Sequence, residues 1–209
     1  MFRSLLAVAA AVVLTLSASL PAHAVPATAA ELLDAKVDYT ANYYLNSSNG
    51  TFHGEVIHAP GRERREFSTS GGHQTLLLRR DIDEATMMWP ERKWYVSTSF
   101  QALAGLIGGF DGVVLDRKPS GRDVIAGEQT TRYDVTAAAG QAGSFAGQMW
   151  FTRDGILMKA KGQVAFQGRE IPVETGLLNL RRIKADPAAF VRPSDYKGLP
   201  LDISKLGLR

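Results

Sequence analysis

Residues 75–98 read TLLLRRDIDEATMMWPERKWYVST and contain three short strand patterns, at Thr75–Arg79, Ala85–Trp89 and Trp94–Thr98. Apolar and aromatic residues dominate each pattern, and the charged residues between them mark turns at Asp81–Asp83 and Pro90–Lys93. Runs of this length between turn residues are typical of antiparallel strands joined by hairpins. This stretch therefore predicts three strands of an antiparallel sheet.

Strand patterns continue on both sides of this stretch. Alternating apolar and polar residues at Val37–Asn46 predict a half-buried strand, and Asn49-Gly50 predicts a tight hairpin turn after it. Asp116–Asp123, with a proline and a glycine among charges, predicts a surface loop. We predict further strands at Thr51–Ala59, Arg62–Thr69, Gln129–Ala137, Phe145–Thr152, Ile156–Phe166 and Glu170–Arg182.

Helical signals are few. Residues 29–36 give a weak helical pattern, and Asp186-Pro187 resembles an N-cap followed by proline in the first helical turn, which predicts one short turn that packs Phe190. The tail that follows, residues 191–209, is rich in proline and glycine and is predicted to be irregular. The fold class predicted from these patterns is mostly β (α+β), a meander.

The N-terminus carries an export pattern. Arg3 precedes an apolar run at 5–16, and Ala22-His23-Ala24 has the small-x-small pattern that signal peptidases recognise. We therefore predict a signal peptide at residues 1–24, cleaved after Ala24, and one domain at residues 25–209 in the periplasm. An uncleaved membrane anchor, the alternative reading, needs a longer apolar span.

Composition limits the partners. The chain has no cysteine, so a lipid-anchored form attached through cysteine and a disulfide framework are both excluded. Its net charge is +3 at pH 7, with basic and acidic residues interleaved, which gives no strong field for nucleic acid. Arg62–Glu66 has two readings, a solvated strand face or a docking patch for acidic lipid headgroups or a membrane partner.

No chemical motif indicates catalysis. His53 and His58 are five residues apart and would face opposite sides of a strand, so they cannot chelate one metal without a bulge. We expect each histidine on the surface or at a strand end, and no metal or cofactor. The chain also lacks the Gly-x-Ser-x-Gly elbow of serine hydrolases. These observations favour a binding protein over an enzyme.

An apolar segment follows the central strands. Residues 100–110, FQALAGLIGGF, carry no charge, and their glycines weaken any helix that they form. Methionine side chains adapt to irregular apolar partners, and Met87, Met88, Met149 and Met158 lie in strand patterns. The segment is a candidate for a movable lid over an apolar cavity, while the alternative for these methionines is an ordinary core.

The order of motifs resembles the LolA-like superfamily, and especially an uncharacterised bacterial branch with a Met-x-Pro-Glu-x-Lys-x-Tyr hairpin. The resemblance covers nearly all of the chain after residue 24 and rests on Gly54–Ile57, Arg65–Phe67, Met87–Tyr95, Thr131–Val135, Gly147–Lys159 and Asp186–Phe190. It implies a half-barrel, in which one strongly curved antiparallel sheet is closed by helices over an apolar cavity, with Phe100–Phe110 as the lid. LolA carriers have an arginine before the proline that ends the second strand. Here Ala59 precedes Pro60, so the resemblance does not include that arginine.

Characterised members of that superfamily carry or sense acylated molecules, which implies non-catalytic binding of a lipid or of the acyl chain of a lipoprotein, with peripheral membrane contact. The alternative is an envelope scaffold that contacts another protein, with its cavity filled by side chains; a hydrolase is a third class. The predicted ligand-binding residues are Tyr43, Val56, Phe67, Leu76, Leu78, Met87, Trp89, Phe100, Leu103, Leu106, Ile107, Phe110, Met149 and Phe151.

Overall fold

The structure is a computed structural model that describes residues 27–28, 33–48, 50–69, 72–100, 114–138, 144–166 and 169–200. Strands joined by turns and short 3-10 helices make up most of this part of the chain. The elements are β1 Ala27–Thr28, β2 Tyr39–Ser47, β3 Gly50–Ala59, β4 Arg62–Thr69, β5 Gly72–Arg79, η1 Arg80–Ile82, β6 Glu84–Trp89, η2 Pro90–Arg92, β7 Trp94–Thr98, β8 Val114–Ile125, β9 Glu128–Ala138, β10 Ser144–Thr152, β11 Leu157–Phe166, β12 Arg169–Arg181, η5 Pro187–Phe190 and β13 Lys197–Gly198.

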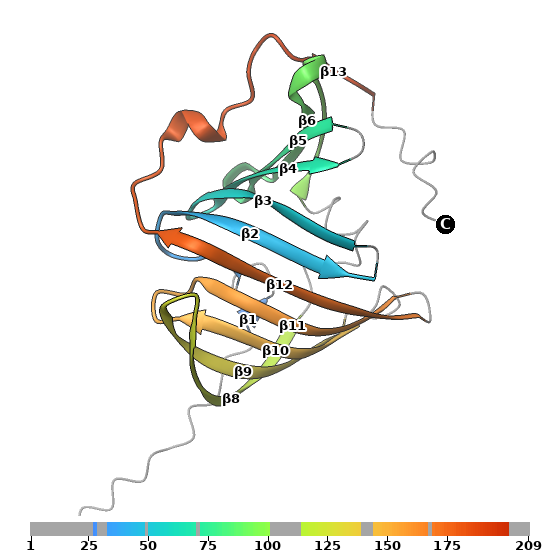
Figure 1. The fold of residues 1–209 in the computed structure, drawn as a ribbon. Coiled ribbons are helices and arrows are strands. Elements are labelled where there is room, and N and C mark those ends of the chain that lie inside the picture. The colour runs from blue at the N-terminus through green and yellow to red at the C-terminus, as the bar shows by residue number, and fades with distance from the viewer. Residues whose placement is uncertain are drawn as a thin grey trace, which may run out of the picture.

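These strands form one 13-stranded sheet in the order β1-β8-β9-β10-β11-β12-β2-β3-β4-β5-β6-β7-β13. β2 to β7 are a meander, β8 to β12 are a second one, and the antiparallel pair of β12 with β2 joins the two halves. Figure 1 shows how strongly the sheet curves. β1 and β13 lie at its opposite edges, so the described strands do not close into a barrel. The predicted mostly β half-barrel is confirmed.

Two successive hairpins use the same turn. η1 is followed by Asp83 and η2 by Lys93, and both residues are in the left-handed region with φ of 51° and 53°. In each turn the backbone N–H of that residue donates to the carbonyl oxygen at the start of the 3-10 helix. Both turns lie where the sequence predicts them. β4 and β7 also have the predicted bounds.

The loop predicted at Asp116–Asp123 is wrong, because these residues belong to β8. Pro119 pairs with Tyr133 and Gly121 with Arg132, so that one extra residue forms a bulge between them. Among the described strands, β8 has a second neighbour only at its first residues, where it pairs with β1. Proline and a bulge are tolerated on such an edge because half of its backbone groups face away from the ladder.

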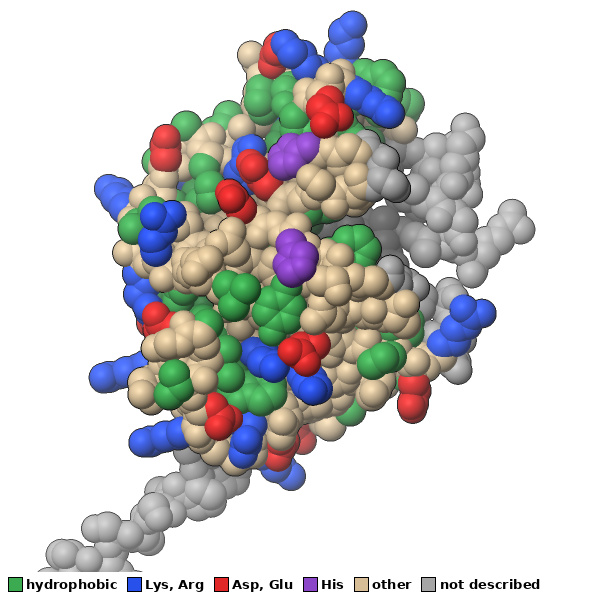
Figure 2. Space-filling view, viewed as in Figure 1, with side chains coloured by type: hydrophobic (Ala, Val, Ile, Leu, Met, Phe, Trp, Pro, Cys, Tyr) green, Lys and Arg blue, Asp and Glu red, His purple; other side chains and the backbone are tan. Residues whose placement is uncertain are grey.

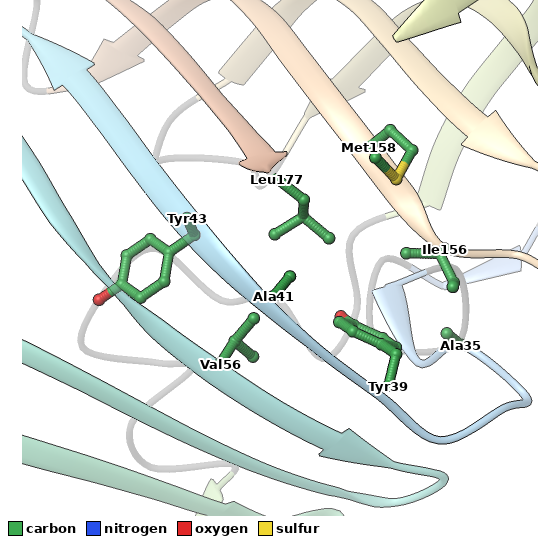
Figure 3. Packing of buried hydrophobic residues seen from close by; sticks show 8 residues of the cluster. All are labelled: Ala35, Tyr39, Ala41, Tyr43, Val56, Ile156, Met158 and Leu177. Carbon is green, nitrogen blue, oxygen red and sulfur yellow. The ribbon is translucent and has the colours of Figure 1, made fainter. Parts of the chain in front are cut away.

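Two clusters of buried apolar side chains lie on the same face of the sheet, which we call the inner face. The larger one (Figure 3) comprises Ala35, Tyr39, Ala41, Tyr43, Val56, Ile156, Met158 and Leu177. The second comprises Leu115, Val135, Met149, Phe151 and Ala160. Pro60 of the β3–β4 turn and Tyr133 of β9 line one pocket although several strands separate them in the sheet. The inner face is therefore concave.

The chain after β12 covers part of the outer face. Figure 1 shows this segment running along one side of the sheet from the end of β12 to β13, which pairs in parallel with β7. The Asp186 side chain accepts a hydrogen bond from the Ala188 N–H, which caps η5 as predicted. Phe190 of η5 is buried with Ala59 and Ala185. Residues 191–200 were predicted to be irregular, and they are irregular except at β13.

Several predictions fall wholly or partly outside the described residues. The signal peptide at 1–24 and lid residues 101–110 lie outside them, as do 29–32 of the predicted helix, while 34–36 are not helical. In the part of the chain that is described, no helix has the length and apolar character needed to cross a membrane. Figure 2 shows acidic and basic side chains interspersed over the face viewed, in agreement with their interleaving in the sequence.

Candidate functional site

The strand registers bring the predicted ligand-binding residues of the strands onto one face. Directly paired residues of neighbouring strands point to the same face of the sheet. Met87 pairs with Leu76, Leu76 with Arg65, Arg65 with Val56, and Val56 with Ala41. These residues, which run from β6 to β2, therefore share one face. Nine predicted residues lie on the inner face by this criterion: Tyr43, Val56, Phe67, Leu76, Leu78, Met87, Trp89, Met149 and Phe151. Their role in binding stays a prediction.

Their burial differs along the sheet. Tyr43, Val56, Met149 and Phe151 are buried, within or beside the two core clusters. The residues of β4 to β6 are only half-buried, namely Phe67, Leu76, Leu78, Met87 and Trp89. Phe100 is also half-buried and lies under the Arg80 guanidinium, with its ring centroid 5.3 Å from Cζ. Leu103, Leu106, Ile107 and Phe110 lie outside the described residues.

The middle of the inner face carries charge, which the sequence reading missed. Glu63 and Arg65 of β4 point to this face, and Arg65 Nε donates to Glu63 Oε1 at 2.6 Å. The Glu63 side chain is only 3% exposed, while that of Arg65 is 36% exposed. The reading of Arg62–Glu66 as a solvated face is therefore wrong for Glu63. β4 has β3 and β5 as neighbours, so it is not an edge strand.

His58 joins this pair. It is fully buried, so the expectation of a surface position is wrong, although it does lie near the end of β3. Its Nε2 lies 2.9 Å from the carbonyl oxygen of Ala35, its Nδ1 lies 3.4 Å from Glu63 Oε2, and its ring stacks on Tyr39 at 4.8 Å. His53 pairs with Tyr44 and His58 with Tyr39, so the two histidines face opposite sides as predicted.

Burial and charge act in opposite directions on Glu63. Burial by itself would raise the pKa of its carboxyl, but the Arg65 guanidinium and the hydrogen bond with His58 hold that pKa well below its usual range. Burial raises the pKa of the neighbouring Tyr39 phenol far above its ordinary value. The group is therefore a carboxylate held by Arg65 beside a neutral phenol, which is the arrangement of a structural ion pair.

Asp34 anchors the irregular segment before β2 against the β3–β4 turn. Its two carboxylate oxygens each accept the Gly61 N–H at 3.0 Å, and Arg80 Nη1 lies 3.4 Å from Oδ1. These contacts hold residues 34–35 in place, and the carbonyl oxygen of Ala35 accepts the hydrogen bond from His58 Nε2. Asp34 and Ala35 also form one wall of a pocket on the inner face.

That pocket has a volume of about 860 Å³ and opens at one end of the inner face. Its aromatic wall is Tyr133 and Phe151, whose rings meet edge to face at 6.0 Å between centroids. The full lining is Asp34, Ala35, Lys36, Val37, Pro60, Arg117, Tyr133, Phe151, Thr152, Arg153, Asp154 and Gly155. Phe151 is thus the predicted ligand-binding residue that reaches it. Arg117 was missed because it was assigned to a loop, although Leu115 two residues earlier gave the alternation of a strand.

The described residues hold no group of three or more histidine, cysteine or acidic side chains placed to bind a metal ion. The pocket combines the aromatic surface of Tyr133 and Phe151 with the charged side chains of Asp34, Lys36, Arg117, Arg153 and Asp154.

Comparisons with known proteins show the fold. No family model matches the chain, and no curated protein matches it. An uncharacterized conserved protein from Thermus thermophilus aligns with a TM-score of 0.54 at 9% identity, over 78% of this chain and 90% of that one. The protein MucB aligns with a TM-score of 0.50 at 10% identity, over 79% of this chain, which spans only 60% of the MucB chain.

A LolA superfamily protein from Nitrosomonas europaea also matches, with a TM-score of 0.40 at 9% identity, over 79% of this chain and 98% of that one. This alignment is too loose to support an inference by itself. At these identities what the chain shares with the Thermus protein and with MucB is the fold, a curved and open β-sheet.

Proposed function

We propose that this protein binds an apolar ligand, a lipid or an acyl chain, against the inner face of its sheet, and that it does so without catalysis. One observation carries the proposal: a pocket of about 860 Å³ opens on the same concave face that holds both apolar clusters. Ligand pockets usually have volumes of about 300 to 1,000 Å³ and mostly apolar walls.

The driving force would come from burying methylene groups. Each buried methylene contributes about 0.8 kcal/mol, which corresponds to about fourfold in Kd. Tyr133, Phe151 and Val37 supply apolar wall to the pocket. A long chain therefore needs little hydrogen bonding to be held, which agrees with the few polar partners that the aromatic wall offers.

The proposal includes export to the periplasm, with a mature chain that starts at Val25. The pattern of residues 1–24 supports it. The mass of the protein recovered from a periplasmic extract gives the cleavage site directly. A mass that retains residues 1–24 would contradict this part of the proposal and leave ligand binding untouched.

The test is a chain-length series on purified protein from which bound lipid has been extracted. Octanol, decanol and dodecanol are titrated by isothermal calorimetry or by displacement of a fluorescent apolar probe. We expect Kd to fall by up to about fourfold for each added methylene until the chain fills the pocket. Absence of binding, or a Kd that does not depend on chain length, would refute the proposal.

Native mass spectrometry of protein purified without extraction separates the proposal from the scaffold alternative. Co-purified acyl lipid supports ligand binding. A ligand-free mass together with a stable protein partner would support the scaffold, in which side chains fill the cavity.

A further inference from the structure

Arg117 holds an unusual position in the pocket. It belongs to β8, pairs with Val135 and so points to the inner face, two residues after the buried Leu115. Its guanidinium carbon lies 5.0 Å from the centre of the Tyr133 ring and 5.9 Å from that of Phe151. The side chain is half-buried against these two rings. An apolar wall thus carries a positive charge at its surface.

Arg117 contacts both rings as a cation over an aromatic ring. A guanidinium that lies on an aromatic ring uses its flat face, whereas its five N–H donors point outward in its plane. Among the described residues, no hydrogen bond or ion pair is observed from this guanidinium to an acceptor. Within the described part of the chain, its donors are therefore available to a ligand that enters the pocket.

The two acidic residues of the pocket, Asp34 and Asp154, do not neutralise the charge of Arg117, because each pairs with another residue. Asp34 accepts the Gly61 N–H and pairs with Arg80. Asp154 receives Arg182 Nε at 2.6 Å, and that pairing lowers the pKa of its carboxyl. Neither Arg80 nor Arg182 lines the pocket.

The remaining charges of the lining are positive. Lys36 and Arg153 stand exposed at the rim, and within the described part of the chain neither forms an ion pair. Together with Arg117 they make the pocket an attractive site for a negative group. Arg117 is the one that lies against the aromatic wall, where water is partly excluded and an ion pair is stronger than at the surface.

We propose that Arg117 is an anion subsite and that the ligand is an anionic amphiphile, whose carboxylate or phosphate binds the Arg117 guanidinium while its apolar chain extends over Tyr133 and Phe151. This inference rests on the proposed function and assigns its ligand class. A planar guanidinium donates two parallel hydrogen bonds to one carboxylate or phosphate, which a lysine cannot do. The aromatic wall beside it selects anions that carry a chain.

The test compares ligands that differ only at the head. Dodecanoate and dodecanol are titrated at pH 8, where the acid is ionised, with acetate and inorganic phosphate as anions without a chain. We expect the wild-type protein to bind dodecanoate at least about tenfold more tightly than dodecanol, and to bind the two short anions far more weakly.

The variants locate the subsite. Arg117→Gln should abolish the preference for dodecanoate over dodecanol, while Arg117→Lys should retain only part of that preference. Lys118→Gln is the matched control, because Lys118 is the exposed neighbour on the same strand with its side chain on the opposite face. It removes the same charge and should leave both affinities unchanged. Thermal unfolding of each variant verifies the fold.

The outcomes separate this inference from the proposed function. Equal affinity of the wild-type protein for dodecanoate and dodecanol, or a preference that survives in Arg117→Gln, would overturn the anion subsite while leaving apolar binding in place. Binding of acetate or phosphate as tight as that of dodecanoate would show a free-anion site and overturn the amphiphile. If no chain-bearing ligand binds, the proposed function itself fails. The first of these outcomes does not depend on the folding of Arg117→Gln, because the acid–alcohol comparison uses the wild-type protein.

Discussion

Glu63 and Glu66 lie on opposite faces of β4, and each pairs with an arginine two residues away. Glu63 pairs with Arg65 on the inner face, and Arg64 Nε donates to Glu66 Oε1 at 2.6 Å on the outer face. The Glu63 side chain is 3% exposed and that of Glu66 is 32% exposed. The same local chemistry thus occurs once in a buried and once in a solvated setting.

Removal of the buried carboxylate should be costly. We predict that Glu63→Gln lowers the free energy of unfolding by about 3 kcal/mol at pH 7, because it leaves Arg65 without its counterion on the inner face. The folded-state pKa of Glu63 lies below the ordinary value of 4.5. Its stabilising contribution is therefore present above that pH and is lost as the pH falls below it. Urea unfolding should show that the difference in free energy of unfolding between wild type and Glu63→Gln narrows below about pH 4.5.

Glu66→Gln is the control for that series, and it should change stability by less than about 1 kcal/mol. Equal effects of the two substitutions would mean that burial of the Glu63–Arg65 pair adds nothing to its strength.

Tyr39 gives the opposite dependence on pH. Burial raises the pKa of its phenol far above the ordinary value of 10, so below that pH its stabilising contribution is complete. Above it, the unfolded chain loses the proton while the folded protein keeps it, and stability falls by up to about 1.4 kcal/mol per pH unit. We predict that Tyr39→Phe makes this alkaline decline shallower. Chemical unfolding between pH 9 and pH 11 measures it, and an unchanged slope in the variant would contradict the assignment.

At the scale of elements, the strands could be predicted because their signals are local. Alternation and turn residues lie within each hairpin, and Trp94–Thr98 and Arg62–Thr69 are observed with the predicted bounds. β8 could not be recognised in the same way, since Pro119 and Gly121 indicate a loop unless the strand is known to lie at an edge. That knowledge depends on the order of strands in the sheet, which is not local.

The polar group around His58 was missed for the same reason. Its acceptor is the carbonyl of Ala35, which lies in an irregular segment 23 residues earlier in the chain. A buried histidine with distant partners leaves no periodic pattern. The position of Arg117 in the pocket could not be predicted either, because its partners Tyr133 and Phe151 lie on other strands, far from it in the sequence.

The segment after β12 acts as a strap on the outer face. Arg64 Nη1 donates to the Ala189 carbonyl and Arg79 Nη1 to that of Phe190, which ties η5 to β4 and β5. Phe190 is 2% exposed beneath the Arg62 guanidinium. The sequence predicted the turn and the packing of Phe190 but not these arginine contacts.

We predict that Phe190→Ala lowers the free energy of unfolding by about 3 to 5 kcal/mol, because it empties a closed apolar site between the strap and the sheet. Its neighbour Val191 is 60% exposed, so Val191→Ala should change stability by no more than about 0.5 kcal/mol. Urea unfolding of both variants decides the point. A small effect of Phe190→Ala would mean that the strap contributes little to the stability of the sheet.

At the scale of the whole molecule, the inner face consists of two unequal parts. The half around β9 and β10 holds the pocket, and the half around β5 and β6 carries half-buried apolar side chains that do not line it. β4, with its Glu63–Arg65 pair, lies between β5 and the core around β2 and β3. The sequence placed all of these residues in one binding surface, since alternation identifies a face but not the position of a cavity on it.

Substitution of two phenylalanines on the inner face tests whether the ligand occupies the pocket alone or the whole face. Phe151 lines the pocket and meets Tyr133, whereas Phe67 packs against the main core outside it. We predict that Phe151→Leu raises the Kd for dodecanol by about tenfold, because it removes aromatic surface from the pocket wall. Phe67→Leu, the same change of side chain, should leave Kd within about twofold. Titration of both variants below their unfolding temperatures gives the answer. If Phe67→Leu weakens binding as much as Phe151→Leu, the ligand extends across β4 despite its charged pair, and the whole inner face acts as one site.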